Sequence, residues 1–309
     1  MSPSPLFLGI DTSNYTTSAA IVAADGTMVA NSRKLLEVKQ GEKGLRQSDA
    51  LFQHWNALPV LLEPLLSEYG KDIAAVCAGN RPRPVEGSYM PVFTAGTNLG
   101  KTLAAALGAQ FFELSHQEGH FLAASYESET DFSRPVICAH LSGGTLELVL
   151  SGDGQYRKIG GTKDISYGQI IDRTGVDLGL SFPAGRAVDD MACSYAPEGL
   201  CDPLCRVFTD KTYLNLSGLE TRLKSAEKDY PPQALCYFLM QRISESFVKI
   251  CESAKKEYAA DQVLVSGGVA CSNFLRNYCK GKGYVFGRKD LCSDNAFGEA
   301  LYARRCYGS

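Results

Sequence analysis

The 309-residue sequence lacks both an excess of positive charge and a long apolar run. Its 31 lysines and arginines against 34 aspartates and glutamates give a formal net charge of −3, so no global positive field attracts nucleic acid or an anionic membrane. No apolar stretch approaches the roughly 20 residues that span a bilayer, and no basic segment with an apolar core marks a secretory signal peptide at the N-terminus. We therefore expect a cytoplasmic protein with no membrane partner, in which any polynucleotide would need a local basic patch.

The cysteines lack the short repeated spacing of a disulfide or zinc framework. The eleven cysteines are scattered along the chain, which is typical of reduced thiols. The nearest pair, Cys201 and Cys205, has no second cysteine pair or histidine nearby to complete a zinc site. The sequence also contains no Walker A motif and no G-x-G-x-x-G after its first strand, which argues against P-loop and Rossmann nucleotide binding.

A repeated plan of strand, polar turn and strand is present instead. An apolar run from Leu6 is followed by the polar turn 11–14 and a second apolar stretch that ends in an Asp-Gly pair. The same order returns from Val136, with residues 142–144 as the turn and Asp153-Gly154 as the closing pair. This repetition predicts two duplicated α/β lobes.

Helices and further strands are expected around these hairpins. Periodicity and small-residue content predict helices over 48–69, which prolines interrupt, 96–107, 232–257, 272–280 and 293–307. Short apolar runs predict strands over 73–78 and 262–265.

Three polar turns are candidates for phosphate binding. Residues 11–14, residues 142–145 and Gly267-Gly268 each place hydroxyls or bare backbone amides at a strand end. Glycine lets the backbone approach an anion, and successive N–H groups form an anion-binding concavity. Each turn alone also has a structural interpretation, because hairpins need glycine or asparagine for their geometry. Three such turns in duplicated halves resemble the two-lobed actin-like ATPase fold, in which a nucleotide lies between the lobes.

Two of the only four histidines, His116 and His120, stand four residues apart. Residues i and i+4 share one face of a helix, so both imidazoles could bind one metal that takes a third ligand from elsewhere. Two surface histidines, or one held by a core hydrogen bond, are the alternative interpretation. Glu118 lies about 200° around such a helix from His116. The pattern therefore differs from the H-E-x-x-H of metalloproteases, and their general base is missing.

Seven motifs in order resemble a single family. They are LGIDTS at 8–13, HQEGH at 116–120, LSGG at 141–144, SFPAGRAVD at 181–189, SGLET at 217–221, VSGGVA at 265–270 and CSDN at 292–295. Together they resemble the carbamoyltransferases that make threonylcarbamoyladenosine in tRNA, a family earlier filed as glycoproteases or O-sialoglycoprotein endopeptidases. The resemblance implies an α/β chain with the two-lobed actin-like ATPase fold, built of duplicated RNase H-like lobes.

The resemblance also implies ligands and the residues that hold them. A divalent metal, iron or zinc, would be bound by His116, His120 and Asp294. An adenine nucleotide, which could be ATP, AMP or a carbamoyl-adenylate, would contact Ser142, Gly143, Gly144, Asp172, Gly185, Asp189, Gly267 and Gly268. Metal and nucleotide would lie between the lobes. The chain would divide into an N-terminal lobe over 1–112, a metal-binding helical connection over 113–134, a C-terminal lobe over 135–290 and a closing helix over 291–309.

The sequence departs from the family pattern close to these positions. Thr145 stands where S-G-G-H has a histidine, and Glu220 replaces the lysine of SGLK. Ser272 replaces the asparagine after G-G-V-A-A, with Asn273 one place late. A diverged paralogue is therefore expected, whose metal and nucleotide positions are better kept than its acceptor positions.

The favoured function is transfer of a threonylcarbamoyl group from its adenylate to an adenine of tRNA, with partner proteins supplying basic surface. Carbamoyl transfer to a small molecule and a non-catalytic nucleotide-binding role stay open as alternatives. A metalloprotease is disfavoured by the direction of Glu118. The acceptor, the metal, the catalytic residues, the oligomeric state and the partner proteins are not determined by the sequence.

Overall fold

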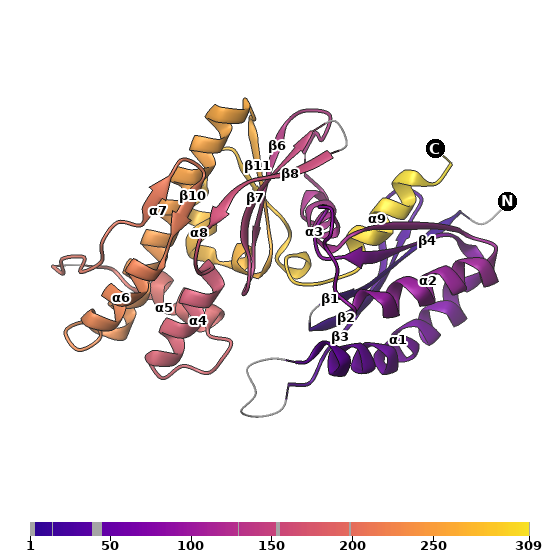
Figure 1. The fold of residues 1–309 in the computed structure, drawn as a ribbon, viewed down its shortest axis with the longest axis horizontal. Helices are drawn as coiled ribbons and strands as arrows, with labels where there is room; N and C mark the ends of the chain where they lie inside the picture. Colours follow the sequence, from indigo (N-terminus) through magenta and orange to yellow (C-terminus); the bar gives the residue numbers. More distant parts are fainter. Residues whose placement is uncertain are drawn as a thin grey trace. The chain divides into compact units, whose positions relative to one another are not determined.

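The protein folds into two compact units in a computed structural model. The structure describes residues 4–13, 15–38, 45–128, 130–152, 155–197 and 199–308. The first unit comprises Met1–Tyr126 and Ser293–Ser309, and the second comprises Glu127–Cys292. Each unit is built on its own mixed β-sheet (Figure 1). Among the helices of the described ranges, none is both long and apolar enough to cross a membrane.

The sheet of the first unit has the strand order β3-β2-β1-β4-β5. Its strands are β1 (Leu6–Ser13), β2 (Thr16–Ala23), β3 (Met28–Leu35), β4 (Ile73–Arg81) and β5 (Gln110–Ser115). The first three form an antiparallel meander, and β4 and β5 add in parallel beside β1.

Four helices cover this sheet. They are α1 (Gln47–Tyr69), α2 (Phe93–Leu107), α3 (His116–Ser125) and α9 (Phe297–Cys306), and the 3-10 turn η1 (Gly70–Asp72) leads from α1 into β4. Leu8 and Ile10 of β1 join a core with residues of α1 and α2, whereas Gly9 between them faces α9. A Cβ at Gly9 would lie 2.1 Å from the Ala296 carbonyl oxygen. Glycine is therefore required at that position for α9 to pack on β1.

The second unit repeats the strand plan of the first and extends it. Its sheet order is β12-β11-β6-β7-β8-β10-β9, with β6 (Val136–Leu141), β7 (Leu146–Gly152), β8 (Gln155–Thr162), β9 (Phe208–Asp210), β10 (Tyr213–Asn215), β11 (Gln262–Ser266) and β12 (Tyr284–Phe286). The antiparallel meander β8-β7-β6 followed by parallel β11 and β12 matches β3-β2-β1-β4-β5. This correspondence confirms the duplication that the sequence predicted.

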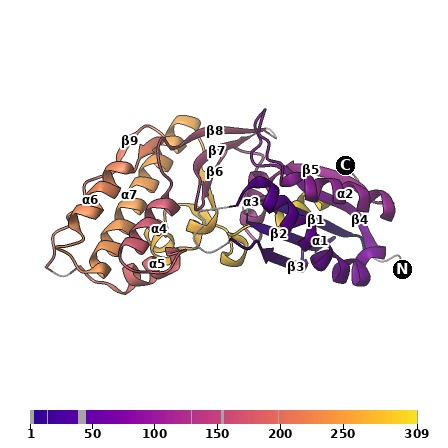
Figure 2. The same ribbon diagram turned by 60° about the horizontal axis from the view of Figure 1, so that its bottom comes forward.

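The helices of the second unit gather mainly on one side of its sheet. They are α4 (Tyr167–Asp177), α5 (Gly185–Ser194), α6 (Ser217–Ala226), α7 (Pro232–Tyr258) and α8 (Asn273–Cys279), with 3-10 turns η2 (Gly268–Cys271) and η3 (Lys289–Leu291). Figures 1 and 2 both show α4 to α7 together on that side. Buried Tyr167 of α4 hydrogen-bonds Ser246 of α7 through its hydroxyl, at 2.8 Å. The long helix α7 thus ties the smaller helices to the core.

Several predicted boundaries were wrong for local reasons. The expected turn 11–14 is wrong for three of its residues, because Asp11, Thr12 and Ser13 belong to β1 and pair with β2. Its fourth residue, Asn14, lies outside the described residues, as do Asp153 and Gly154. Helix α1 runs through Pro59 and Pro64 without interruption.

The two expected C-terminal helices begin later than predicted. The Asn295 side chain accepts a hydrogen bond from the Phe297 N–H at 3.0 Å, so residues 293–295 form a capping turn in front of α9. Ser272 is the N-cap residue of α8, so the helix itself begins at Asn273. The 3-10 turn η2 separates α8 from Gly267.

Candidate metal centre and nucleotide cavity

Helix α3 of the first unit starts in a capping box that sets the direction of its side chains. The Ser115 hydroxyl accepts a hydrogen bond from the Glu118 N–H at 3.3 Å, and Glu118 Oε2 accepts one from the Ser115 N–H at 2.8 Å. His116 is therefore the first helical residue, and His120 follows one turn later on the same face. Their Nε2 atoms lie 3.1 Å apart. Glu118 is engaged at the cap, whereas its angle around the helix predicted only that it points away from a metal shared by the histidines.

Asp294 reaches the two histidines from the capping turn before α9, 174 residues along the chain from His120. Its Oδ1 lies 3.3 Å from His120 Nε2 and 3.6 Å from His116 Nε2. Ligand atoms around a tetrahedral ion with bonds of roughly 2.1 Å lie about 3.4 Å apart. The structure thus brings the three predicted ligands together at separations that fit one ion. The thiols of Cys201 and Cys205 are free and exposed.

The charges of these groups are interdependent. Burial opposes ionisation of Asp294, but hydrogen bonds with His116 and His120 hold the pKa of its carboxyl well below the usual value. Burial also lowers the pKa of His120, and the neighbouring His116 lowers it further. The pKa of His116 is raised despite burial, because the Asp11 carboxylate lies beside it. The cluster therefore contains one imidazole held neutral, which is the form that binds a metal.

Two further carboxyl groups, those of Asp11 and Glu299, lie close to His116. Glu299 was not predicted from the sequence. Asp11 Oδ2 is 3.2 Å from His116 Nδ1. Glu299 of α9 is fully buried, and among the described residues neither its two carboxyl oxygens nor Asp11 Oδ1 has a hydrogen-bond partner. Burial, followed by the charge of Asp11, raises the pKa of Glu299 well above its usual value. An environment of buried oxygen acceptors without donors favours a cation.

Two glycines make room for these carboxylates. A Cβ at Gly79 would lie 2.4 Å from Asp11 Oδ1, and a Cβ at Gly119 would lie 2.4 Å from Glu299 Oε1. Gly119 is the glycine of HQEGH, so its place in that motif has a packing reason: any side chain there would collide with Glu299.

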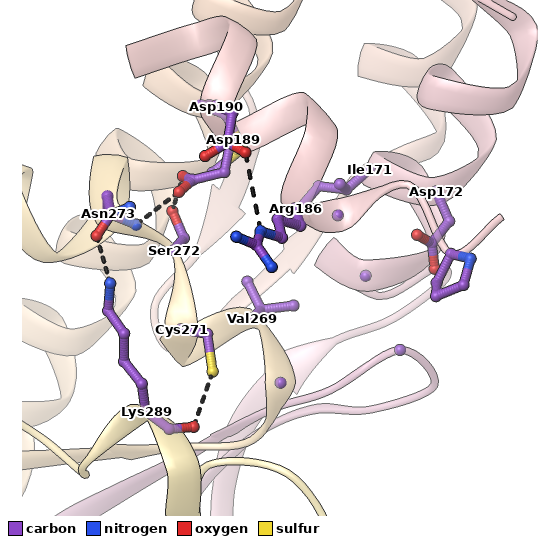
Figure 3. A pocket seen from close by; sticks show the side chains of 16 residues that line it. Ile171, Asp172, Arg186, Asp189, Asp190, Val269, Cys271, Ser272, Asn273 and Lys289 are labelled. Carbon is purple, nitrogen blue, oxygen red and sulfur yellow. Dashed lines mark hydrogen bonds and ion pairs between the residues drawn. The ribbon is translucent and has the colours of Figure 1, made fainter. Parts of the chain in front are cut away.

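The second unit contains a cavity of about 610 Å³ (Figure 3). Five of the eight predicted nucleotide positions line it, namely Gly143, Asp172, Gly185, Asp189 and Gly268. Ser142, Gly144 and Gly267 are next to lining residues but are not part of its wall. Other residues that line the cavity were not predicted from the sequence, among them Ile171, Arg186, Met240, Val269, Cys271, Asn273 and Lys289.

Glycines shape the cavity wall in two ways. A Cβ at Gly168 would lie 2.5 Å from the Gly143 Cα, so α4 begins directly against the β6–β7 turn. At Gly143, Gly185 and Gly268 an added Cβ would meet no atom within 4 Å, so the backbone at these positions faces open space. Glycine is required at position 267 by the backbone instead, since Gly267 has a φ of 89° and packs against Leu141.

The cavity carboxylates are anchored to backbone N–H groups. Asp172 Oδ1 accepts from the Ala184 N–H at 2.8 Å. Burial raises the pKa of Asp172, although this hydrogen bond lowers it. Buried Asp189 accepts from the Asn273 N–H at 2.7 Å and the Phe274 N–H at 3.1 Å. It also accepts from the Ser272 hydroxyl, so it fastens α8 to α5.

The departures from the family pattern have local partners. The Ser272 hydroxyl is engaged twice, as donor to Asp189 and as acceptor from the Leu275 N–H at 3.0 Å. Glu220 forms an ion pair with Arg173 at 3.1 Å. The Thr145 N–H donates to the Ser142 hydroxyl at 3.1 Å, which closes the β6–β7 turn.

Solved structures establish the class of fold. Component A of the (R)-2-hydroxyglutaryl-CoA dehydratase of Acidaminococcus fermentans matches 98% of both chains with a TM-score of 0.56 and 16% identity. A ROK family glucokinase from Streptomyces griseus matches 97% of this chain and 99% of its own, with a TM-score of 0.54 and 12% identity. The protein has the two-lobed actin-like ATPase fold, as the resemblance implied.

Sequence relatives then define the family within that class. The family model described as tRNA N6-adenosine threonylcarbamoyltransferase matches residues 28–301. The enzyme of that name from Sinorhizobium medicae is 30% identical over 94% of this chain and 86% of its own. One from Thermus thermophilus is 31% identical over 96% of this chain and 92% of its own. The chain belongs to the tRNA N6-adenosine threonylcarbamoyltransferase family, which confirms the resemblance and identifies it as a transferase.

Proposed function

We propose that the chain transfers a threonylcarbamoyl group from its adenylate to an adenine of tRNA in the cytoplasm. The observation that carries the proposal is the convergence of His116, His120 and Asp294 in a chain of this family. The reaction forms a bond between the exocyclic nitrogen of adenine and the carbamoyl carbon. It breaks the bond from that carbon to the adenylate oxygen, so that AMP leaves and the nitrogen loses a proton.

The first unit would hold one divalent ion, iron or zinc, through His116, His120 and Asp294. Two imidazoles and one carboxylate are a donor set that suits both metals and leaves positions open for substrate. Asp11 orients the ring of His116 through Nδ1, so that Nε2 faces the other two ligands. When bound, the ion supplies Lewis acidity to a carbamoyl or phosphate oxygen.

The second unit would bind the adenylate in its cavity. Its volume of about 610 Å³ lies within the range of small-molecule sites, roughly 300–1,000 Å³. The bare backbone at Gly143 and Gly268 allows a phosphate to approach closely. Asp172 has one carboxyl oxygen besides the one bonded to the Ala184 N–H, and this oxygen can accept from a ribose hydroxyl. The glucokinase that shares the fold was solved with glucose and AMPPNP, which supports a nucleotide role for this fold.

The test is a reconstituted reaction with threonylcarbamoyl-adenylate and unmodified tRNA, with and without partner proteins from a cell extract. We expect mass spectrometry of the nucleosides to show threonylcarbamoyladenosine with the wild-type chain and partners, and none with His120→Ala. Glu118→Gln is the matched control, because glutamine also closes a capping box. The proposal would be contradicted if wild type and His120→Ala released AMP from the adenylate at equal rates and neither formed a modified nucleoside.

A further inference from the structure

We propose that Arg186 is a specificity-determining residue that stacks its guanidinium on the base of the bound nucleotide. The inference rests on the proposed nucleotide site of the second unit. Arg186 is the second residue of α5 and lines the cavity. Figure 3 shows its side chain reaching from α5 into the cavity, toward the side where Val269 and Cys271 of η2 lie. The juxtaposition of a planar cation and an apolar wall is the basis of the proposal.

The Arg186 side chain is available to a ligand. It is 96% exposed, and its ion pair with Asp190 is long, at 3.9 Å, with Asp190 itself 64% exposed. Such a surface pair within one helix contributes little to stability. The other cation of the cavity differs, because Lys289 donates to the side-chain oxygen of Asn273. No strong ion pair therefore has to be broken for Arg186 to turn toward a bound molecule.

The remaining acids of the cavity compete only weakly for the guanidinium. Both oxygens of Asp189 accept hydrogen bonds from the start of α8, and Asp172 is bonded to the Ala184 N–H. A guanidinium in the cavity thus meets carboxylates that already have donors. Its flat faces are free for contact with a ring.

The walls of the cavity suit a flat, weakly polar ring. Ile171, Pro183, Met240 and Val269 contribute apolar surface to it. A guanidinium plane stacks on aromatic systems through cation–π and dispersion contacts, and a lysine ammonium cannot reproduce the planar part of that contact. A purine held between Arg186 and this apolar surface satisfies both. The phosphates are then left to the bare backbone at Gly143 and Gly268.

Calorimetric titration with AMP, adenosine and ribose 5-phosphate separates base contact from phosphate contact. For Arg186→Ala we expect AMP and adenosine to bind about tenfold more weakly, with ribose 5-phosphate unchanged. Arg186→Lys keeps the charge without the plane, so it should recover less than half of the lost affinity. Arg222→Ala, which removes an exposed arginine of α6 outside the cavity, is the matched control and should bind all three ligands like the wild type.

Three outcomes would overturn the inference. Equal weakening of AMP and ribose 5-phosphate in Arg186→Ala, with recovery in Arg186→Lys, would make the residue a phosphate contact. Unchanged AMP binding in Arg186→Ala would remove it from the site altogether, while leaving the nucleotide cavity in place. Absence of AMP and adenosine binding to the wild-type chain would overturn both this inference and the proposed nucleotide site. Thermal unfolding of each variant verifies that the substitutions leave the fold intact.

Discussion

The carboxyl groups near the histidine cluster of the first unit and those in the cavity of the second unit differ in their hydrogen bonding. In the cluster, among the described residues, the buried oxygens of Glu299 and one oxygen of Asp11 have no hydrogen-bond partner. In the cavity, Asp189 accepts three hydrogen bonds and Asp172 accepts one. The first site contains buried carboxyl oxygens without hydrogen-bond partners, whereas the carboxylates of the second accept hydrogen bonds from backbone N–H groups.

This difference indicates how each site would depend on a ligand. His116, His120 and Asp294 place three ligand atoms around one point, so a metal bound there would be part of what stabilises the cluster. In the cavity, Asp189 connects α5 and α8 through hydrogen bonds within the protein. Metal removal should therefore perturb the first unit more than nucleotide removal perturbs the second.

The largest effect is expected from removing a metal ligand. His116→Ala leaves one imidazole and one carboxylate, which is too few donors for a stable site, so the metal content measured by elemental analysis should fall from about one equivalent to nearly none. Glu118→Gln lies on the same helix, faces the cap and should retain the metal. Equal metal content in the wild type and His116→Ala would disprove the ligand assignment.

The next largest effect is expected from breaking the link between α5 and α8. Asp189→Ala leaves two backbone N–H groups and the Ser272 hydroxyl without their acceptor. We expect a loss of about 2–4 kcal/mol in the free energy of unfolding, since each unsatisfied buried donor costs roughly 1–3 kcal/mol and solvent reaches some of them. Ser272→Ala removes a helix cap and should cost about 1 kcal/mol. Urea denaturation compares the two variants, and equal losses would mean that Asp189 does no more than orient Ser272.

Local patterns predicted one part of this comparison and not the other. The i,i+4 spacing of His116 and His120 determines a shared helix face, and at Gly267 a φ of 89° requires glycine in the turn after β11. Glu299 could not be found in this way, since a single acid in a helix is usually exposed. Its burial arises from packing against Gly119, which lies far away in sequence.

The strands and cavity residues show the same division. The segment 136–141 was predicted with its observed bounds because it is apolar apart from His140. Strand β3 was missed, because it lies at the sheet edge and carries charged, partly exposed residues. Arg186, Asn273 and Lys289 carry no joint signal in the sequence. They share a cavity only because α5, α8 and η3 meet in the fold.

A pH-dependent effect is expected from Asp164, which is neither a candidate metal ligand nor part of the cavity wall. Burial raises its pKa, but hydrogen bonds from the N–H groups of Leu216, Ser217 and Ile165 outweigh this and lower the pKa to about 2. Because the folded pKa lies below the usual value near 3.8, the stabilisation is complete above about pH 4 and is lost as the pH falls toward 2. The difference in urea midpoint between wild type and Asp164→Asn should shrink over that interval. A difference that stays constant down to pH 2 would show that the carboxylate charge contributes nothing.

The smallest expected effect concerns tRNA and Glu220. The chain carries a net charge of −3, and binding to tRNA depends on lysine and arginine contacts with phosphates. We therefore expect the isolated chain to bind tRNA only nonspecifically, at ~10⁻⁴–10⁻⁶ M in physiological salt. Glu220→Lys breaks the ion pair with Arg173, which costs at most about 1 kcal/mol because Arg173 is exposed. It exchanges a negative for a positive charge, so filter binding should show an affinity gain of less than about tenfold and a slightly steeper salt dependence. Nanomolar binding by the unmodified chain alone would contradict the expectation that partner proteins supply the basic surface.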